Sequence, residues 1–471
     1  MYPTKRLLKP TALYVSLLAL AACSAQENST SEPYAPVKYA DLIKAPSPET
    51  LELMSINPEL ERQIIKVADN VHVAVGYAAS VFTFIEGNDG IVMIDTGQLT
   101  DASTDALAEY RKISDKPITG IVFTHSHGDH IGGIAPFIDR DNPPKIWARN
   151  NFGDETQAFR GSGIRINAKR GVRQAGFMLP PEQRINNGIA PPVYPKKETF
   201  NPAKSFKVTN EVSGDTQISI SGITLVLANA DGETADQISI WYPDKRIVFA
   251  GDNFYQSWPN LYAIRGTPYR DVQAWAKTTS DMRALKADVL VGGHTLPIIG
   301  AENVDHALGT YHAGISYIFD KTIEGINKGL GPDELVEYAK LPAELANERV
   351  LRPFYGNPDW AIRAIFQGYL GWYDGNPTNL FPLLPKKEAL KMVELAGGEA
   401  AMMEQLRTAV TQSEDQWATQ LADYLLLINP GNAEAMRLKA DALTRLAEKN
   451  PTATARNYYL TYARELRTRA K

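Results

Sequence analysis

Apolar residues in the first part of the chain recur in short runs that glycines and polar turns separate. The runs 71–75, 81–85, 91–94 and 118–123 are rich in valine, isoleucine and phenylalanine, a pattern that predicts β-strands. Residues 101–112 instead have apolar positions at helical spacing, with Leu107 and Tyr110 on one face. Strands that alternate with helices in this way indicate an α/β fold.

The same pattern returns further along, with predicted strands at 218–220, 224–227, 238–242, 247–250 and 289–291. Two sets of strands with helices between them predict an αββα sandwich over residues 63–300, with a site at the strand ends. After residue 300 the spacing becomes helical, as at 305–328 and 387–471. Residues 417–422 and 429–435 further predict tetratricopeptide-like hairpins, so 301–471 is interpreted as an all-helical domain.

Composition fits this division into domains. A chain of 471 residues is too long for one ordinary core, and 44% hydrophobic with 22% charged residues is typical of globular proteins. The net charge of −5 argues against nucleic acid as the main partner.

The N-terminus predicts export. Basic residues precede an apolar run at 12–22, which is typical of a signal peptide over 1–22 and too short for a confident membrane span. The run ends in Leu20-Ala21-Ala22-Cys23, which resembles the bacterial lipoprotein cleavage box, and Cys23 is the only cysteine. We therefore expect lipid on Cys23 and a tether over 23–62, clearest to about Pro46. An ordinary signal peptide with an incidental cysteine is the alternative.

A lipoprotein signal of this kind would place the protein in the periplasm, where it would contact a membrane only through its lipid anchor. Ser24 follows the cysteine where an aspartate would indicate retention at the inner membrane, which favours the outer membrane.

Metal ligands gather directly after the predicted strand 118–123. His125, His127, Asp129 and His130 lie within six residues, and they include three of the seven histidines of the chain. Zinc prefers imidazole with one or two carboxylates, so this segment predicts a metal centre in which two adjacent sites are possible. A surface loop that happens to contain histidines is the alternative.

This H-x-H-x-D-H run resembles the signature of the metallo-β-lactamase fold. The resemblance implies that Asp95 supports the histidines, and that Asp252 bridges two metals at the end of its strand. It implies two zinc ions, with catalytic roles for Asp129 and Asp252. The implied ligands are His125, His127 and Glu233 for one ion, Asp129, His130 and His294 for the other, and Asp252 for both.

Further residues make the chain similar to the alkylsulfatase branch of that superfamily, from about residue 65 to the C-terminus. Glu233 stands where the wider fold has histidine, and residues 260–266 are close to the family's N-L-Y-x-x-R-G stretch. The segments 355–357 and 364–377 also match. The resemblance implies an alkyl sulfate ester as substrate, hydrolysed to alcohol and sulfate, and a homodimer formed by the helical domain.

The resemblance also assigns the sulfate contacts to Asn260, Tyr262 and Arg265. A sulfate monoester is a permanent anion, which suits the planar fork of Arg265 and neutral donors from the other two. A structural salt bridge is the alternative for Arg265.

Two departures from the family pattern bear on the substrate. Asp252 is shorter than the family's usual bridging glutamate, and the chain ends at Lys471, about where longer members continue into a sterol-carrier-like domain. Long-chain sulfates are therefore a less secure expectation than the sulfate ester itself.

The remaining polar residues gave weaker expectations. Residues 150–198 are loop-like and contain five clustered cations that could cover an anionic substrate or simply face solvent: Arg160, Arg165, Lys169, Arg170 and Arg173. His72 is expected on the solvent side of its strand, and His306 and His312 are expected to pack or face solvent.

Two other functions remain open from the sequence. One is another hydrolase on the same scaffold, such as a lactonase, lactamase or phosphoesterase. The other is a non-catalytic envelope lipoprotein whose helices recruit partners.

Overall fold

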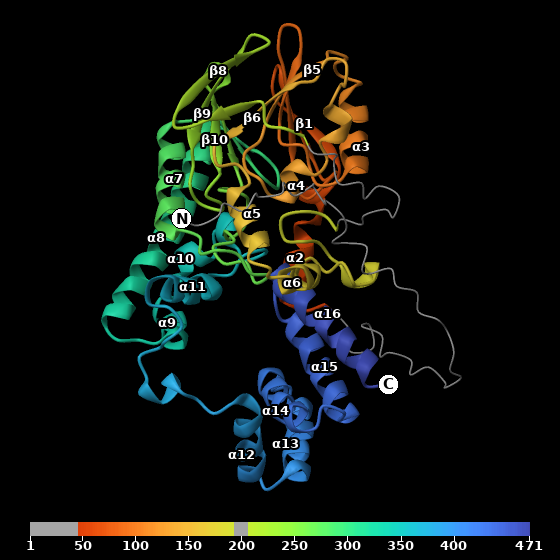
Figure 1. Cartoon of the computed structure of the whole chain (residues 1–471), viewed down its shortest axis with the longest axis vertical. Coiled ribbons are helices and arrows are strands. Elements are labelled where there is room, and N and C mark those ends of the chain that lie inside the picture. The colour runs from red at the N-terminus through yellow and green to blue at the C-terminus, as the bar shows by residue number, and fades with distance from the viewer. Residues whose placement is uncertain (1–45, 193–205) are drawn as a thin grey trace, which may run out of the picture. The chain divides into compact units, whose positions relative to one another are not determined.

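The computed structural model describes residues 46–192 and 206–471 (Figure 1). Cys23, the predicted signal peptide and most of the predicted tether lie outside these residues. The first sheet has seven strands, and their spatial order follows the chain. Its strands are β1 (Gln63–Ala68), β2 (Val71–Val75), β3 (Phe82–Glu86), β4 (Ile91–Ile94), β5 (Ile118–Val122), β6 (Lys145–Arg149) and β7 (Asn210–Val212). The pairs from β1 to β4 are antiparallel and those from β4 to β7 are parallel.

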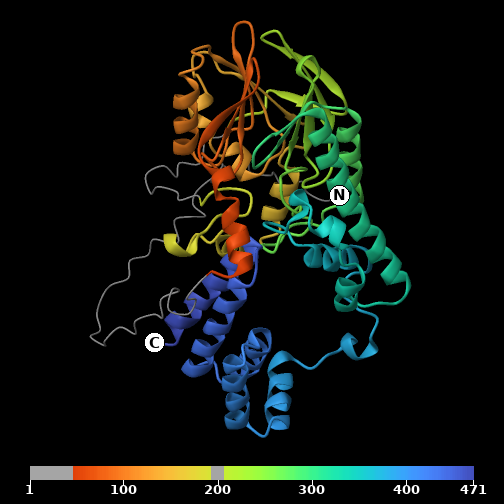
Figure 2. The same ribbon diagram turned by 180° about the vertical axis from the view of Figure 1, so that it is seen from behind.

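A six-stranded sheet faces the first one (Figure 1, Figure 2). In spatial order it contains β13 (Ile298–Ile299), β12 (Val289–Gly292), β11 (Ile247–Gly251), β10 (Ile238–Tyr242), β9 (Ile223–Asn229) and β8 (Thr216–Ile220). Only β11 and β12 pair in parallel within this sheet. On β9, Ile223, Leu225 and Leu227 are buried while the residues between them are partly exposed, as expected for a strand with one face on a core.

One apolar core joins the inner faces of the two sheets. It includes Val73 and Val122 from the first sheet and Leu225, Ile240 and Phe249 from the second. Removing this area from water is the main favourable term that holds the two sheets together.

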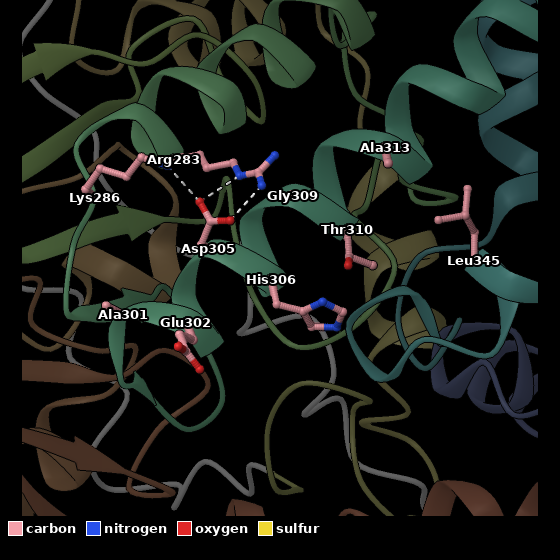
Figure 3. Close-up of a pocket in the computed structure, with 10 residues that line it drawn as sticks. All are labelled: Arg283, Lys286, Ala301, Glu302, Asp305, His306, Gly309, Thr310, Ala313 and Leu345. Carbon is pink, nitrogen blue, oxygen red and sulfur yellow. Dashed lines mark hydrogen bonds and ion pairs between the residues drawn. The ribbon is translucent and has the colours of Figure 1, made fainter.

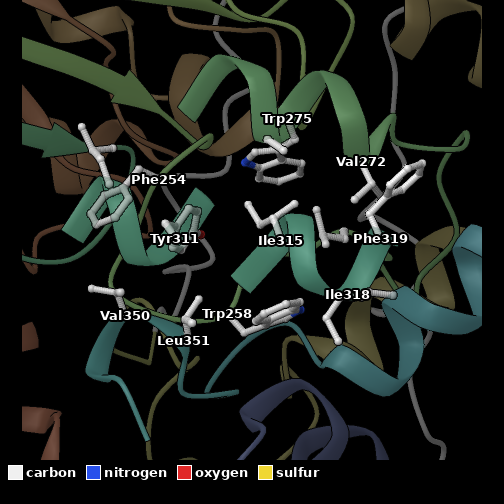
Figure 4. Packing of buried hydrophobic residues seen from close by; sticks show 14 of the residues in the cluster. Phe254, Trp258, Val272, Trp275, Tyr311, Ile315, Ile318, Phe319, Val350 and Leu351 are labelled. Carbon is white, nitrogen blue, oxygen red and sulfur yellow. The ribbon is translucent and has the colours of Figure 1, made fainter. Parts of the chain in front are cut away.

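Helices cover both outer faces. On the first sheet, α3 (Thr100–Tyr110) places Tyr110 in a stack on Phe84, with 4.0 Å between ring centroids. On the second, α7 (Val272–Ala284) and α8 (Ala301–Asn327) build a core around Trp275 and Tyr311 (Figure 4). The predicted αββα sandwich is therefore confirmed.

All-helical structure after residue 300 is confirmed as well. Beyond α8 the chain forms α9 (Pro332–Tyr338), α10 (Ala343–Ala346), α11 (Pro358–Leu370), α12 (Pro385–Leu395), α13 (Glu399–Thr411), α14 (Asp415–Ile428), α15 (Ala433–Glu448) and α16 (Ala453–Arg469). From α13 onward each helix packs on the next. Within the described ranges, no helix is long and apolar enough to cross a membrane.

Three local predictions need correction. Residues 48–55 form helix α2 (Pro48–Ser55), because Leu53 and Ile56 bury their side chains beside Phe354, so the tether cannot extend to residue 62. The insertion 150–198 is partly helical, with α5 (Asp154–Gly161) and α6 (Ile166–Gln174). His72 is buried against Tyr110, because α3 covers that face of the sheet.

The two histidines of α8 lie as expected. His306 is exposed beside Glu348, and His312 bonds through Nδ1 to the carbonyl of Ala276.

Candidate metal centre

All seven predicted metal ligands lie at one end of the sandwich, where strands of both sheets end. His125 and His127 follow β5, and Asp129 and His130 belong to the short helix α4 (Gly128–Ile131). From the second sheet, Glu233 lies between β9 and β10, Asp252 follows β11 and His294 follows β12. These side chains form two groups that share Asp252, and the potential ligand atoms within each group lie within 4.8 Å of one another.

The first group contains His125, His127, Glu233 and Asp252. Glu233 Oε2 lies 3.5 Å from His125 Nε2 and 3.4 Å from His127 Nδ1. Asp252 Oδ2 lies 3.8 Å from His125 Nε2. Ligand atoms bound at about 2.0–2.2 Å to one tetrahedral ion are separated by roughly 3.3–3.6 Å, so this spacing fits a single cation.

The second group contains Asp129, His130, Asp252 and His294. Asp252 Oδ1 lies 3.1 Å from His130 Nε2 and 3.2 Å from His294 Nε2. Asp129 Oδ2 lies 3.8 Å and 3.7 Å from the same two nitrogens. Asp252 Oδ2 also lies 3.3 Å from His294 Nε2, so Oδ1 faces the second group while Oδ2 lies between the two groups. The carboxylate is therefore placed to contact two cations.

Neighbouring groups fix the orientation of the imidazoles. His130 Nδ1 bonds to Asp95 Oδ2 at 2.7 Å, and His294 Nδ1 donates to the carbonyl of Ala79 at 2.6 Å. Each bond leaves Nε2 directed at the cluster, which is how ligand histidines are held in metal sites. Asp95 also accepts bonds from the amide and hydroxyl of Thr124, and its φ of 57° places it in the left-handed region. The supporting position predicted for Asp95 is therefore observed.

Electrostatics in the cluster favour cation binding. Burial and the nearby His130 hold the pKa of His125 well below its ordinary value, so this imidazole stays neutral. Burial opposes charge on His130, yet the carboxylates of Asp252 and Asp95 raise its pKa well above the usual range. Burial also acts against ionised Asp252, but His294 and His130 hold its pKa well below normal. Without metal, protons on the histidines balance the carboxylates, and a metal ion would displace them.

Unpaired buried atoms give a direct test of fit to a metal. His125 Nε2, His130 Nε2, Glu233 Oε2 and Asp252 Oδ1 are buried without a hydrogen-bond partner. Buried polar atoms are normally satisfied, so four of them converging on one place indicate a missing ligand. Glycine at position 293 leaves room for the Asp252 carboxylate, since a Cβ there would lie 2.0 Å from Asp252 Oδ1. Imidazole and carboxylate donors of this kind suit a divalent transition metal such as zinc.

Sequence reasoning missed Arg270. Its guanidinium is buried, and Nη1 contacts Glu233 Oε1 at 2.7 Å and donates to the carbonyl of Asn260. The local sequence Tyr269-Arg270-Asp271 does not indicate that Arg270 contacts a metal ligand. The contact with Glu233 forms only because the loop after Asn260 folds back onto the strand ends.

The predicted substrate residues lie on the loop beside the cluster. Asn260 is buried with Nδ2 unpaired, and Tyr262 and Arg265 are partly buried. Burial raises the pKa of Tyr355 to about 12, with Arg265 acting against the rise and Glu233 adding to it. Tyr355 therefore lies within electrostatic reach of both Arg265 and the metal-ligand carboxylates. Among the described residues, the Arg265 guanidinium has no ion-pair or hydrogen-bond partner, so the structure shows no structural salt bridge there.

The five cations of the insertion have different surroundings. Arg173 is tied to Glu465 of α16 and lies over the rings of Tyr458 and Tyr462, so it anchors α6 and is not free for substrate. Arg170 lies beside the substrate loop, with Nη1 3.9 Å from the Cβ position of Gly266. The other three are exposed: Arg160, Arg165 and Lys169.

A separate groove of about 600 Å³ lies along α8 (Figure 3). Within its lining, Arg283 and Lys286 both contact Asp305. None of the metal-cluster residues lines it.

Comparison with known families divides the chain in the same way as the fold. Residues 76–294 match the model of the metallo-beta-lactamase superfamily, and residues 331–469 match that of alkyl sulfatase dimerisation.

Characterised relatives extend the match over most of the chain. A linear primary-alkylsulfatase from Pseudomonas sp. is 34% identical over 392 residues, covering 81% of this chain and 73% of the relative. An (R)-specific secondary-alkylsulfatase from Pseudomonas sp. is 30% identical over 436 residues, covering 88% and 65%. The solved structure of a stereoselective inverting sec-alkylsulfatase from Pseudomonas sp. superposes with a TM-score of 0.82 at 28% identity, covering 91% of this chain and 70% of that one.

Proposed function

Since the chain belongs to the alkylsulfatase family of the metallo-β-lactamase superfamily, we propose that it hydrolyses alkyl sulfate monoesters at a centre of two zinc ions. The observation that carries this proposal is the seven-residue cluster, which Arg270 links to the loop that contains Arg265. The metal ligands alone would fit many hydrolases. The Arg265 guanidinium has no ion-pair partner among the residues described, which fits an anionic ester.

The proposed ligands follow the two groups. His125, His127 and Glu233 would hold one ion, Asp129, His130 and His294 would hold the other, and Asp252 would serve both. When bound, the ions would lower the pKa of water toward neutrality and stabilise charge on the departing ester oxygen. Asp129 and Asp252 are acceptor-only carboxylates at neutral pH, because the histidines hold both their pKa values below normal. They can therefore orient a water by accepting its hydrogen bond.

The sulfate group would be bound on the loop 260–266. Arg265 offers a planar fork of donors that matches two sulfate oxygens, and its charge does not depend on pH in the working range. Asn260 Nδ2 is buried and unpaired, so a sulfate oxygen would satisfy it. Tyr262 adds a neutral hydroxyl from the same loop.

A substrate panel tests the proposal. Purified protein loaded with zinc should release inorganic sulfate from alkyl sulfates, and removal of zinc by a chelator should abolish this release. Arg265→Gln should lower kcat/KM for alkyl sulfates by about 10- to 100-fold, the usual effect of losing charge-assisted hydrogen bonds. Arg246→Gln, which removes an exposed arginine paired with Asp288, is the matched control and should leave the rate unchanged.

The same panel decides between hydrolases. Turnover of lactones, β-lactams or phosphoesters with none of alkyl sulfates would refute the sulfatase while keeping a metal hydrolase. Zinc-free wild-type protein without any of these activities would refute the enzyme altogether.

Localisation of the protein is a separate part of the proposal. The sequence before residue 46 supports a lipid-anchored protein in the periplasm, attached through Cys23 and tethered to the outer membrane. The check is whether the mature protein fractionates with membranes and Cys23→Ser releases it. Soluble wild-type protein without lipid would refute the anchor.

A further inference from the structure

Arg270 connects the metal centre to the substrate loop. The same nitrogen, Nη1, contacts Glu233 Oε1 at 2.7 Å and donates to the backbone carbonyl of Asn260. The Arg270 and Glu233 side chains are only 3% and 4% exposed. The contact is therefore a buried ion pair whose energy depends on both partners being present.

The contact sets which oxygen of Glu233 faces the metal site. With Oε1 held by Arg270, Oε2 is left 3.5 Å from His125 Nε2 and 3.4 Å from His127 Nδ1, and it has no hydrogen-bond partner. A glutamate side chain has more rotatable bonds than histidine. An outside contact is thus needed to fix its carboxylate, as second-layer carboxylates and carbonyls fix ligand histidines.

Charge gives a second reason for the arginine. Glu233 adds a buried carboxylate to a cluster that already contains the buried Asp252 and the partly exposed Asp129. A buried carboxylate without a counter-charge is strongly unfavourable, whereas a neutral imidazole at this position would need none. The two histidines of the second group, His130 and His294, lie beside Asp129 and Asp252. Arg270 supplies the positive charge at Glu233.

We propose that Arg270 is a positioning residue that makes Glu233 a competent metal ligand and couples the metal site to the sulfate-binding loop through Asn260. This inference rests on the proposed function, since it requires zinc at the first group. Arg270 itself contacts neither the substrate nor the metal.

A double-mutant cycle with Glu233→His tests the idea. The variants are Arg270→Met, Arg270→Lys, Glu233→His and Glu233→His with Arg270→Met. Zinc affinity is measured with chelators of graded strength, and folding is checked by circular dichroism. Arg149→Met is the matched control, because Arg149 pairs with Asp231 in the same segment but touches no ligand.

We expect Arg270→Met to weaken zinc binding by about 10- to 100-fold, as is usual for outer partners of metal ligands. Arg149→Met should bind zinc like the wild type. In the Glu233→His background the same arginine change should alter zinc affinity by less than about threefold, because histidine needs no counter-charge. Arg270→Lys, which keeps the charge, should retain most zinc affinity but raise KM for an alkyl sulfate, since the shorter lysine side chain does not bring its ammonium to the position of Nη1, from which both oxygens are held.

Two results would overturn the inference. One is wild-type zinc affinity in Arg270→Met. The other is an equal loss with and without Glu233→His, which would give Arg270 a general role in folding only. If Arg270→Met does not fold, the inference is tested by the zinc affinity of Arg270→Lys and by that of Glu233→His with and without Arg270→Met. Two zinc ions in the wild type with no effect of Arg270 would refute this inference alone, whereas a wild type without zinc would refute the proposed function as well.

Discussion

Asp252 occupies the position on which both metal groups depend. Its Oδ1 lies 3.1 and 3.2 Å from the Nε2 atoms of His130 and His294, and its Oδ2 lies between the groups, 3.8 Å from His125 Nε2 and 3.3 Å from His294 Nε2. The related family usually has a longer glutamate at this position. Here the shorter side chain still reaches both groups because Gly293 has no Cβ that would collide with Oδ1. The position of the Asp252 carboxylate thus depends on a glycine at position 293.

At the residue scale, the bridging role predicts opposite results for two substitutions of Asp252. Asp252→Asn removes one anionic oxygen, so we expect one tightly held zinc per chain in place of two. Asp252→Glu keeps both anionic oxygens and should retain two zinc ions, with a changed kcat. Metal content after dialysis, measured by atomic emission, checks both. Asp244→Asn, an exposed turn residue, is the control, and two tightly held ions in Asp252→Asn would contradict a bridge.

At the scale of elements, α6 connects the substrate loop to the helical domain. Gln174 Oε1 accepts the amide of Arg265, and Gly171 lets the Arg265 side chain approach, with Cδ 3.9 Å from its Cβ position. At its other side, Arg173 is bound to Glu465 of α16. The insertion therefore packs against the loop proposed to bind sulfate, and it is held in place by a helix nearly 300 residues further along the chain.

This packing predicts a role for Arg170 in substrate affinity. Arg170 lies beside Gly266 and has no ion-pair partner among the residues described, so it adds positive charge next to Arg265. Arg170→Gln should raise KM for alkyl sulfates about fivefold, the size of a partly solvated charge contact, with little change in kcat. Lys169→Gln, on the adjacent exposed position of α6, should leave KM unchanged. Equal effects of the two substitutions would mean that only the net charge of the insertion matters.

At the scale of the whole molecule, one segment leaves large apolar side chains in solvent. Between α11 and α12, Trp372 is 70% and Phe381 94% exposed. Leu380, Leu383 and Leu384 of the same segment are exposed too, as are Tyr369 and Leu370 at the end of α11. Exposed apolar patches of this kind mark association surfaces, and the segment lies within the region that matches the dimerisation family. A second copy of the chain is the expected occupant.

The dimer is predicted to depend on this segment. Trp372→Ser combined with Phe381→Ser should give a monomer, because aromatic anchors contribute most of the energy of such interfaces. Light scattering after size exclusion measures the mass. Ile299→Ser, at an exposed apolar residue of β13, is the control and should remain dimeric. A wild type that is monomeric at all concentrations would contradict the proposed homodimer.

Much of this architecture could be read from local sequence pattern. Periodicity identified the strands from β2 to β5 and from β8 to β12, because each lies between turn residues and buries one or both faces. The ligands His125, His127, Asp129 and His130 are adjacent in sequence, so their clustering needed no tertiary information. Glu233, Asp252 and His294 were identified only through the family resemblance. Strands β1, β6 and β7 were missed, since they are short or partly exposed and lack a clear apolar run.

The sequence by itself determined the types of the main core strands and helices, the metal-ligand chemistry and its place at the strand ends, because these follow from side-chain period and residue type. Only the tertiary structure decided which long-range neighbours support the site. The contact of Arg270 with Glu233, the anchoring of Arg173 by Glu465 and the burial of His72 under Tyr110 each join residues that no local pattern relates. Such contacts depend on how loops and helices pack after the sheets have formed, and packing is a property of the whole chain.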